Sequence, residues 1–145
     1  MHRQSGFSLL EVLITIVILA IGLLGLAGLT AASMRNNHGA YNRSQAVWLA
    51  YDISDRMRAN RVVARGGGYN IALGASAPTG STTSATDLGQ WLTAVAALPA
   101  GLGAINVDAG TSRATITIQW NETRAAGAAA VADDEARQFV VQTQL

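Results

Sequence analysis

An apolar stretch from Phe7 to Met34 constrains this chain more than any other feature of its sequence. No charged side chain occurs between Val12 and Met34. At about 1.5 Å of rise per residue, a helix over this stretch is long enough to cross a hydrocarbon layer of about 30 Å. The sequence therefore predicts a membrane-spanning helix.

Glu11 is the one charged side chain within this stretch. An ionised carboxylate in lipid costs on the order of a few kcal/mol, so it needs a partner. No lysine, arginine or histidine lies between Arg3 and Arg35, so no side chain of the segment can neutralise it. The nearest cation would be a new α-amine, formed if the chain were cut just before Phe7.

The residues that precede the stretch, MHRQSG at 1–6, are short, polar and basic, and they end in the small residue Gly6. A secretory signal has the opposite order, with its cleavage site after the apolar core. Two plainer interpretations fit the sequence less well. A signal anchor explains the apolar run but not Glu11. A signal cut near Ala31–Ser33 would need an apolar core longer than the usual range of about 7 to 15 residues.

The segment GFSLLEVLITIVILAIGLLGLAGL, residues 6–29, resembles the leader and first helix of type IV prepilins and type II secretion pseudopilins. The resemblance implies that a membrane peptidase cuts after Gly6 and methylates Phe7. It also implies that the Glu11 carboxylate pairs with the N-terminal amine of a neighbouring subunit during assembly. The likeness is specific because it combines three features: the short basic leader, the Gly–Phe junction and the acidic residue four positions after Phe7.

Two other parts of the chain resemble the PilV family of minor pilins: AVWLAYDISDRMRANR at 46–61, and ITIQWNET with the final VVQTQL. The resemblance implies a minor pilin that takes part in priming a type IV pilus, and so in twitching motility and adhesion. The partners implied are other minor pilins, the major pilin, the prepilin peptidase/methyltransferase and the pilus assembly platform. The implied location is the inner membrane, with one span and a periplasmic head, and after assembly the pilus filament or its tip.

Two alternatives stay open at this point. The first is a minor pseudopilin of a type II secretion system, which the first helix cannot distinguish from a pilin. The second is a membrane-anchored module that binds DNA or a surface through the arginines between Arg35 and Arg65. Against it, removal of Arg3 with the leader leaves nine arginines and nine acidic residues, and nucleic-acid binding favours a basic face. A solvated helix face with local pairs, such as Asp52 with Arg56, is the favoured explanation of these arginines.

The remaining pattern predicts an α+β pilin fold, in which one long helix packs on an antiparallel sheet of three to four strands. The expected divisions are a leader (1–6), a transmembrane and assembly half of the first helix (7–34), an amphipathic half (35–61) and a periplasmic head (62–145). The helix is expected from Phe7 to Asn60. Its inner residues recur at helical spacing: Ala46, Leu49, Ala50, Ile53 and Met57.

The head is expected to hold one short helix and the strands. A polar loop over Ala75–Thr86 should precede the helix, which Thr86 or Asp87 would cap and which would run to Leu98. Its inner face would carry Leu88, Trp91, Leu92 and Val95. Strands are expected around Ile105 and Val107, over Arg113–Gln119 and over Arg137–Gln144. Ile116 and Ile118 should share one face, opposite Thr115, Thr117 and Gln119, while the face of Trp120 is left open.

The chain offers little for catalysis. It has no cysteine, and its only histidines are His2, in the leader, and His38, expected on the surface. Neither a histidine-based triad nor a zinc site can be assembled from these side chains. The acidic run Asp133–Glu135 lacks the alternating spacing of a calcium loop, and Gly66–Gly68 lacks the lysine of a phosphate loop. We expect no enzyme activity, catalytic residue, metal or cofactor.

Overall fold

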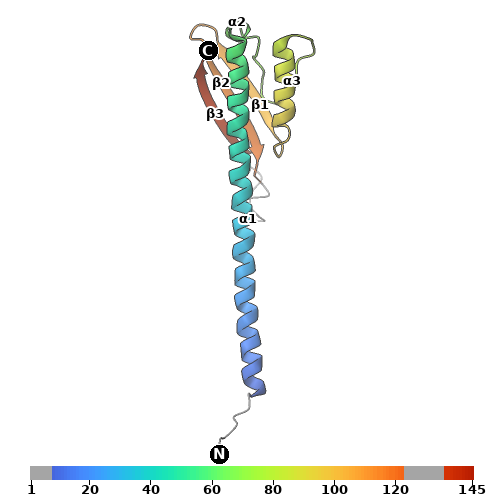
Figure 1. The fold of residues 1–145 in the computed structure, drawn as a ribbon, viewed down its shortest axis with the longest axis vertical. Coiled ribbons are helices and arrows are strands. Elements are labelled where there is room, and N and C mark those ends of the chain that lie inside the picture. Colours follow the sequence, from blue (N-terminus) through green and yellow to red (C-terminus); the bar gives the residue numbers. More distant parts are fainter. Residues whose placement is uncertain (1–7, 123–135) are drawn as a thin grey trace, which may run out of the picture. The chain divides into compact units, whose positions relative to one another are not determined.

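The computed structural model describes residues 8–122 and 136–145. The predicted leader with Gly6 and Phe7, and the acidic run Asp133–Glu135, lie outside these residues. The elements follow in the order (Figure 1) α1 (Leu9–Ala59), α2 (Arg61–Arg65), α3 (Thr83–Val95), β1 (Leu102–Asp108), β2 (Arg113–Asn121) and β3 (Ala136–Gln144). The predicted α+β arrangement, with a long N-terminal helix packed on an antiparallel sheet, is confirmed, and the sheet has three strands.

Two compact units make up the chain, Met1–Asn37 and His38–Leu145. In the first unit the described residues from Leu9 onward form the apolar part of α1. This helix is long and apolar enough to cross a membrane, and none of its most hydrophobic window is buried. The predicted spanning helix is therefore present as an exposed helix.

In the second unit, α1 contributes one apolar stripe to the core. Ala46, Ala50, Ile53 and Met57 are buried as their spacing predicted, and Leu49 is half-buried beside them. The stripe packs with the inner faces of α3 and the sheet in one cluster. On α3, Leu88, Trp91 and Val95 are buried, and the Trp91 ring lies where a side chain on Gly103 would clash. A glycine in β1 thus makes room for the largest residue of α3.

The sheet has the order β1-β2-β3, and both pairings are antiparallel. On the central strand β2, Ile116 lies opposite Ile105 of β1 and Val141 of β3. Every second residue of β2 is buried, so Ile116 and Ile118 share the inner face as predicted. Trp120 lies on that same face and is buried, which settles the open question of its side.

The predicted start of the head helix is wrong. α3 begins at Thr83, and its cap is Thr82, whose hydroxyl accepts a hydrogen bond from the Ala85 N–H at 3.2 Å. The first turn of α3 therefore occupies the end of the expected loop over Ala75–Thr86. The helix begins early for two reasons. The Thr82 hydroxyl satisfies an N–H of the first turn that would otherwise have no partner, and Ala85 in that turn is buried in the head. The helix also ends earlier, at Val95 instead of Leu98.

The junction between α1 and the head contains a helix that the sequence did not predict. α1 ends at Ala59, and Asn60 leaves the helical region with φ −111° and ψ 46°. α2 follows over Arg61–Arg65, and the Ala64 N–H donates to the Asn60 carbonyl at 3.0 Å. Ala64 is buried, so this turn also joins the core.

Candidate functional site: the surface of the first helix

Large apolar side chains cover α1 on all sides from its start to Met34. They are exposed in the described chain: Leu9, Leu10, Val12, Leu13, Ile14, Ile16, Val17, Ile18, Leu19, Ile21, Leu23, Leu24, Leu26, Leu29 and Met34. We call these residues the apolar surface. A helix that is hydrophobic all round is stable only in lipid or among other helices. The apolar surface is therefore where this chain meets its surroundings.

Glu11 lies in the first turn of α1, within the apolar surface. Its backbone N–H donates to the Ser8 carbonyl at 3.0 Å, but its exposed carboxylate has no hydrogen bond or ion pair with any described residue. A carboxylate is favoured at a helix N-terminus by the helix dipole, which offsets only part of the cost of placing it in lipid. Of the three predicted site residues, the structure places Glu11 alone, since Gly6 and Phe7 lie outside the described residues.

The two threonine hydroxyls of the apolar segment are satisfied within the helix. The Thr15 hydroxyl donates to the carbonyls of Glu11 at 3.0 Å and Val12 at 2.8 Å, and the Thr30 hydroxyl donates to the Leu26 carbonyl at 2.9 Å. Such back-bonding is the usual way to hide a hydroxyl in an apolar helix. Glu11 differs from these threonines because its side chain needs a partner from outside the described chain.

Gly22, Gly25 and Gly28 form a stripe along the same segment. A methyl group added at any of them would meet no atom within 4 Å. Packing within the chain therefore does not require glycine there, and each glycine costs the helix about 1 kcal/mol relative to alanine. Small residues of this kind let another helix approach closely.

The arginines of the head mostly bind groups of the head itself. Arg56 pairs with Asp52 at 3.1 Å, which confirms the local pair expected from the sequence. It also donates to Gln90 at 2.7 Å and pairs with Asp87 at 3.3 Å, so it joins α1 to α3. Most of the donor groups that a binding surface would need at Arg56 are thus already in use.

A second set of arginines holds the end of β3. Arg58 donates to the Thr143 hydroxyl at 2.7 Å and pairs with Asp55 at 2.9 Å. Arg61 and Arg65 both donate to the carbonyl oxygen of Leu145, Arg61 at 2.9 Å. These contacts fasten α1 and α2 to the last strand, a structural role that the sequence did not reveal.

A buried polar network around Tyr69 was also missed. The Tyr69 side chain is 0 % exposed, and its hydroxyl donates to Asp87 at 2.6 Å and accepts from the Asn60 side chain at 3.2 Å. Burial, and then the bond to the Asp87 carboxylate, raises the pKa of Tyr69. The network connects the end of α1, the segment after α2 and α3. No local sequence signal marks it, because its members are far apart in the chain.

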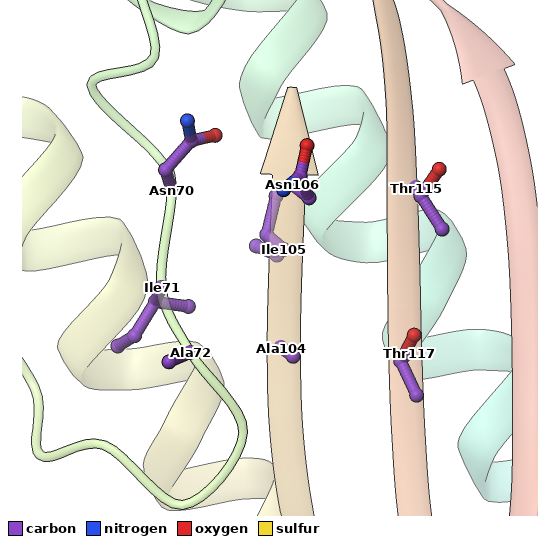
Figure 2. A pocket seen from close by; sticks show the side chains of 8 residues that line it. All are labelled: Asn70, Ile71, Ala72, Ala104, Ile105, Asn106, Thr115 and Thr117. Atoms are coloured by element: carbon purple, nitrogen blue, oxygen red, sulfur yellow. The ribbon is translucent and has the colours of Figure 1, made fainter. Parts of the chain in front are cut away.

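The surface of the sheet carries one shallow hollow of about 370 Å³ (Figure 2). Its walls are small or neutral: Asn70, Ile71, Ala72, Ala104, Ile105, Asn106, Thr115 and Thr117. The Asn70 side-chain oxygen already accepts the Val107 N–H at 2.7 Å. The hollow has no acid or base that could activate the hydroxyls of Thr115 and Thr117, so its lining offers neither acid–base chemistry nor an activated nucleophile.

Metal and histidine chemistry find no site in the part of the chain that the structure describes. No group of three or more metal-ligating side chains occurs among these residues. His38 is exposed, as expected. The candidate functional site is therefore the apolar surface with Glu11.

Among known protein families, one model matches the N-terminal part of this chain. Residues 1–27 match the family model described as the prokaryotic N-terminal methylation motif. No curated protein and no solved structure matches the chain. The motif, together with the long apolar helix, supports a membrane-anchored protein of the type IV pilin or pseudopilin kind. It also implies processing by a prepilin peptidase and assembly with other pilins.

Proposed function

We propose that this chain is a minor pilin of a type IV pilus, of the PilV kind, which takes part in priming pilus assembly. The single observation that supports the proposal most is a methylation motif that continues into an exposed apolar helix, whose Glu11 carboxylate has no partner among the described residues. The protein is inserted in the inner membrane as a prepilin, with its head in the periplasm. It is cut after Gly6, methylated on Phe7, and then packed into a bundle with other pilins. Twitching motility and adhesion depend on the resulting filament.

The mechanism of assembly is physical. Apolar faces of first helices pack against one another, and the glycine stripe at Gly22, Gly25 and Gly28 allows close approach. Glu11 pairs with the amine of Phe7 on a neighbouring subunit. Two unit charges about 4 Å apart interact by about 4 kcal/mol at an effective dielectric constant near 20. Because the pair forms at only one axial offset between two helices, it sets the step at which subunits stack.

A minor pseudopilin of a type II secretion system shares this mechanism and the same motif. The likeness of 46–61 and 140–145 to PilV favours the pilus. Deletion of the gene from its host distinguishes the two. A pilus component predicts loss of surface pili and twitching with normal protein secretion, and a pseudopilin predicts the reverse.

A DNA- or surface-binding module is the weaker alternative. Arg56, Arg58, Arg61 and Arg65 all make bonds within the head. Only Arg35 and Arg43, of the arginines between 35 and 65, lack a bond to any described residue. Salt-sensitive DNA binding by the chain at micromolar affinity or better would revive this alternative.

The role of Glu11 is tested with Glu11→Ala in the full chain, with Ser8→Ala, at the residue just before α1, as the control. We expect Glu11→Ala to insert and be cleaved normally, because the leader and the apolar run are intact, but to be absent from sheared pili. Ser8→Ala should be incorporated like the wild type. Immunoblots of membrane and pilus fractions measure both outcomes. Normal incorporation of Glu11→Ala would refute the proposed role.

A further inference from the structure

The hollow in Figure 2 lies on the face of the sheet opposite the core. On this face Ala104 and Asn106 of β1 lie beside their register partners on β2, Thr117 and Thr115 (Figure 2). The residues that alternate with them along both strands are buried in the core. The volume of about 370 Å³ falls within the range of small-molecule sites, about 300 to 1,000 Å³.

Several polar groups of the lining have no partner within the described chain. The hydroxyls of Thr115 and Thr117 are half-buried, and neither has a hydrogen bond to a described residue. The same holds for the side-chain amide of Asn106. The oxygen of Asn70 is used by the Val107 N–H, but its amide nitrogen has no described partner. These groups are therefore available to a ligand.

The register fixes how far apart these groups lie. Ile105 exchanges its backbone bonds with Ile71, so Asn106 and Thr115 form a hydrogen-bonded pair between β1 and β2, with Cα atoms about 5.5 Å apart. Thr115 and Thr117 are two residues apart on one strand, which separates them by about 7 Å. Threonine hydroxyls and asparagine amides each offer a donor and an acceptor. Sugar hydroxyls do the same, and a sugar ring presents several of them over a similar span.

The lining disfavours other classes of ligand. It contains no charged side chain, so a phosphate or carboxylate would find no counter-ion in the hollow. The next row of the same face holds Asp108 opposite Arg113, whose charges offset each other. An extended peptide would need free backbone groups on β1, but those of Ile105 already bond to Ile71 at 2.9 Å.

We propose that this hollow binds a neutral saccharide. Its hydroxyls bond to the side chains of Thr115, Thr117 and Asn106, and a C–H face of the ring packs on Ala104 and Ile71. The proposal goes beyond the proposed function, and it uses only residues of the head.

The test uses the isotope-labelled full-length chain in micelles of dodecylphosphocholine, a detergent that contains no sugar. The probes are the methyl glycosides of glucose, galactose and mannose, and nuclear magnetic resonance follows the amide signals. We expect at least one glycoside to shift the signals of Thr115, Thr117 and the Asn106 side chain saturably, with a Kd of about 10 mM or tighter. The matching uronate, which has a carboxylate in place of the hydroxymethyl group, should bind at least about tenfold more weakly.

Substitutions in the hollow make the test specific. Thr117→Val removes a hydroxyl but keeps the shape of a good strand former, and it should weaken binding about fivefold. Thr79→Val is the matched control, because Thr79 is exposed and lies outside the hollow. Ala104→Phe fills the hollow from the outer face and should weaken binding at least about tenfold. Retained dispersion of the amide signals verifies the fold, and Thr115→Val replaces Thr117→Val if that variant unfolds.

Three results would overturn the proposal. All three glycosides could leave the signals of the hollow unchanged at about 50 mM. The uronate could bind as tightly as its neutral counterpart. The hydroxyl and Ala104→Phe variants could both bind as well as the wild type, which would place the saccharide elsewhere. None of these outcomes depends on whether Glu11 functions in assembly, so this proposal and the proposed function can fail separately.

Discussion

At the scale of single residues, Asp87 is the carboxylate that connects the buried Tyr69 hydroxyl with Arg56. It accepts from the buried Tyr69 hydroxyl and pairs with Arg56, and its own side chain is only 16 % exposed. A carboxylate with two partners in a partly buried site loses more on neutralisation than a surface pair does. Asp87 therefore joins α3 to α1.

We predict that Asp87→Asn lowers the free energy of unfolding by about 1 to 2 kcal/mol, because both of its hydrogen bonds lose a charged partner. The matched control is Asp55→Asn, whose pair with Arg58 is on the surface and whose side chain is 72 % exposed. That change should cost less than about 0.5 kcal/mol. Denaturant unfolding followed by tryptophan fluorescence measures both. Equal effects would contradict the assigned role of Asp87.

The raised pKa of Tyr69 predicts a late step in alkaline titration. Burial and the Asp87 carboxylate both favour the neutral phenol in the folded chain. This contribution to stability is fully present below the unfolded pKa of about 10 and is lost as pH rises through the higher folded value. Ultraviolet absorbance of phenolate should show one tyrosine titrating late in the wild type and none in Tyr69→Phe. A late component that persists in Tyr69→Phe would contradict the assignment.

Residue-level features divide clearly into those that the sequence predicts and those that it does not. The Asp52–Arg56 pair and the surface position of His38 follow from local spacing and are confirmed. The contacts of Asp87 with Tyr69, and of Arg65 with Leu145, join residues far apart in the sequence. Helical or strand periodicity carries no information on such pairs, so they required the structure.

At the scale of elements, the start of α3 shows how a cap is chosen. Thr82, Thr86 and Asp87 all have side chains that favour a helix N-terminus. Of these three side chains, only the Thr82 hydroxyl accepts a hydrogen bond from a backbone N–H of the first turn, that of Ala85. Thr86 already lies inside the helix, because its own N–H donates to the Thr82 carbonyl at 3.0 Å. Asp87 instead faces Arg56 and Tyr69.

We predict that Thr82→Ala destabilises the head by about 1 kcal/mol, through loss of the cap. Thr86→Ala is the control, because Thr86 is exposed within α3 and alanine is a better helix former. It should leave stability unchanged or raise it slightly. Thermal unfolding followed by circular dichroism compares the two. A larger loss for Thr86→Ala would mean that the helix begins later than the structure has it.

Elements with strong periodicity were predicted well, and elements defined by their ends were not. The inner stripe of α1 and the alternation in β2 are confirmed because burial of one face imposes the period. The end of the first helix near Asn60 was predicted, but the short helix α2 that follows it was missed. The burial of Trp120 followed once the inner face of β2 was fixed by Ile116 and Ile118.

At the scale of the whole molecule, the two units differ in what identifies them. Residues 1–27 match the prokaryotic N-terminal methylation motif, and the sequence alone was enough to recognise its pattern. Among the described residues of the head, the segment at 70–71 covers the β1 edge of the sheet and β3 pairs only with β2, which composition and periodicity do not reveal. The apolar helix was therefore predicted from the sequence, whereas the pairing of the sheet edges required the structure.

The central claim is that Glu11 is tolerated near the front of an apolar helix because a newly formed amine on a neighbouring subunit neutralises it. N-terminal mass spectrometry of the protein purified from its host tests this most directly. The account predicts a mature chain that begins with Phe7 and carries a methyl group on its amine. A chain that retains residues 1–6, or one that has lost the apolar helix altogether, would contradict it.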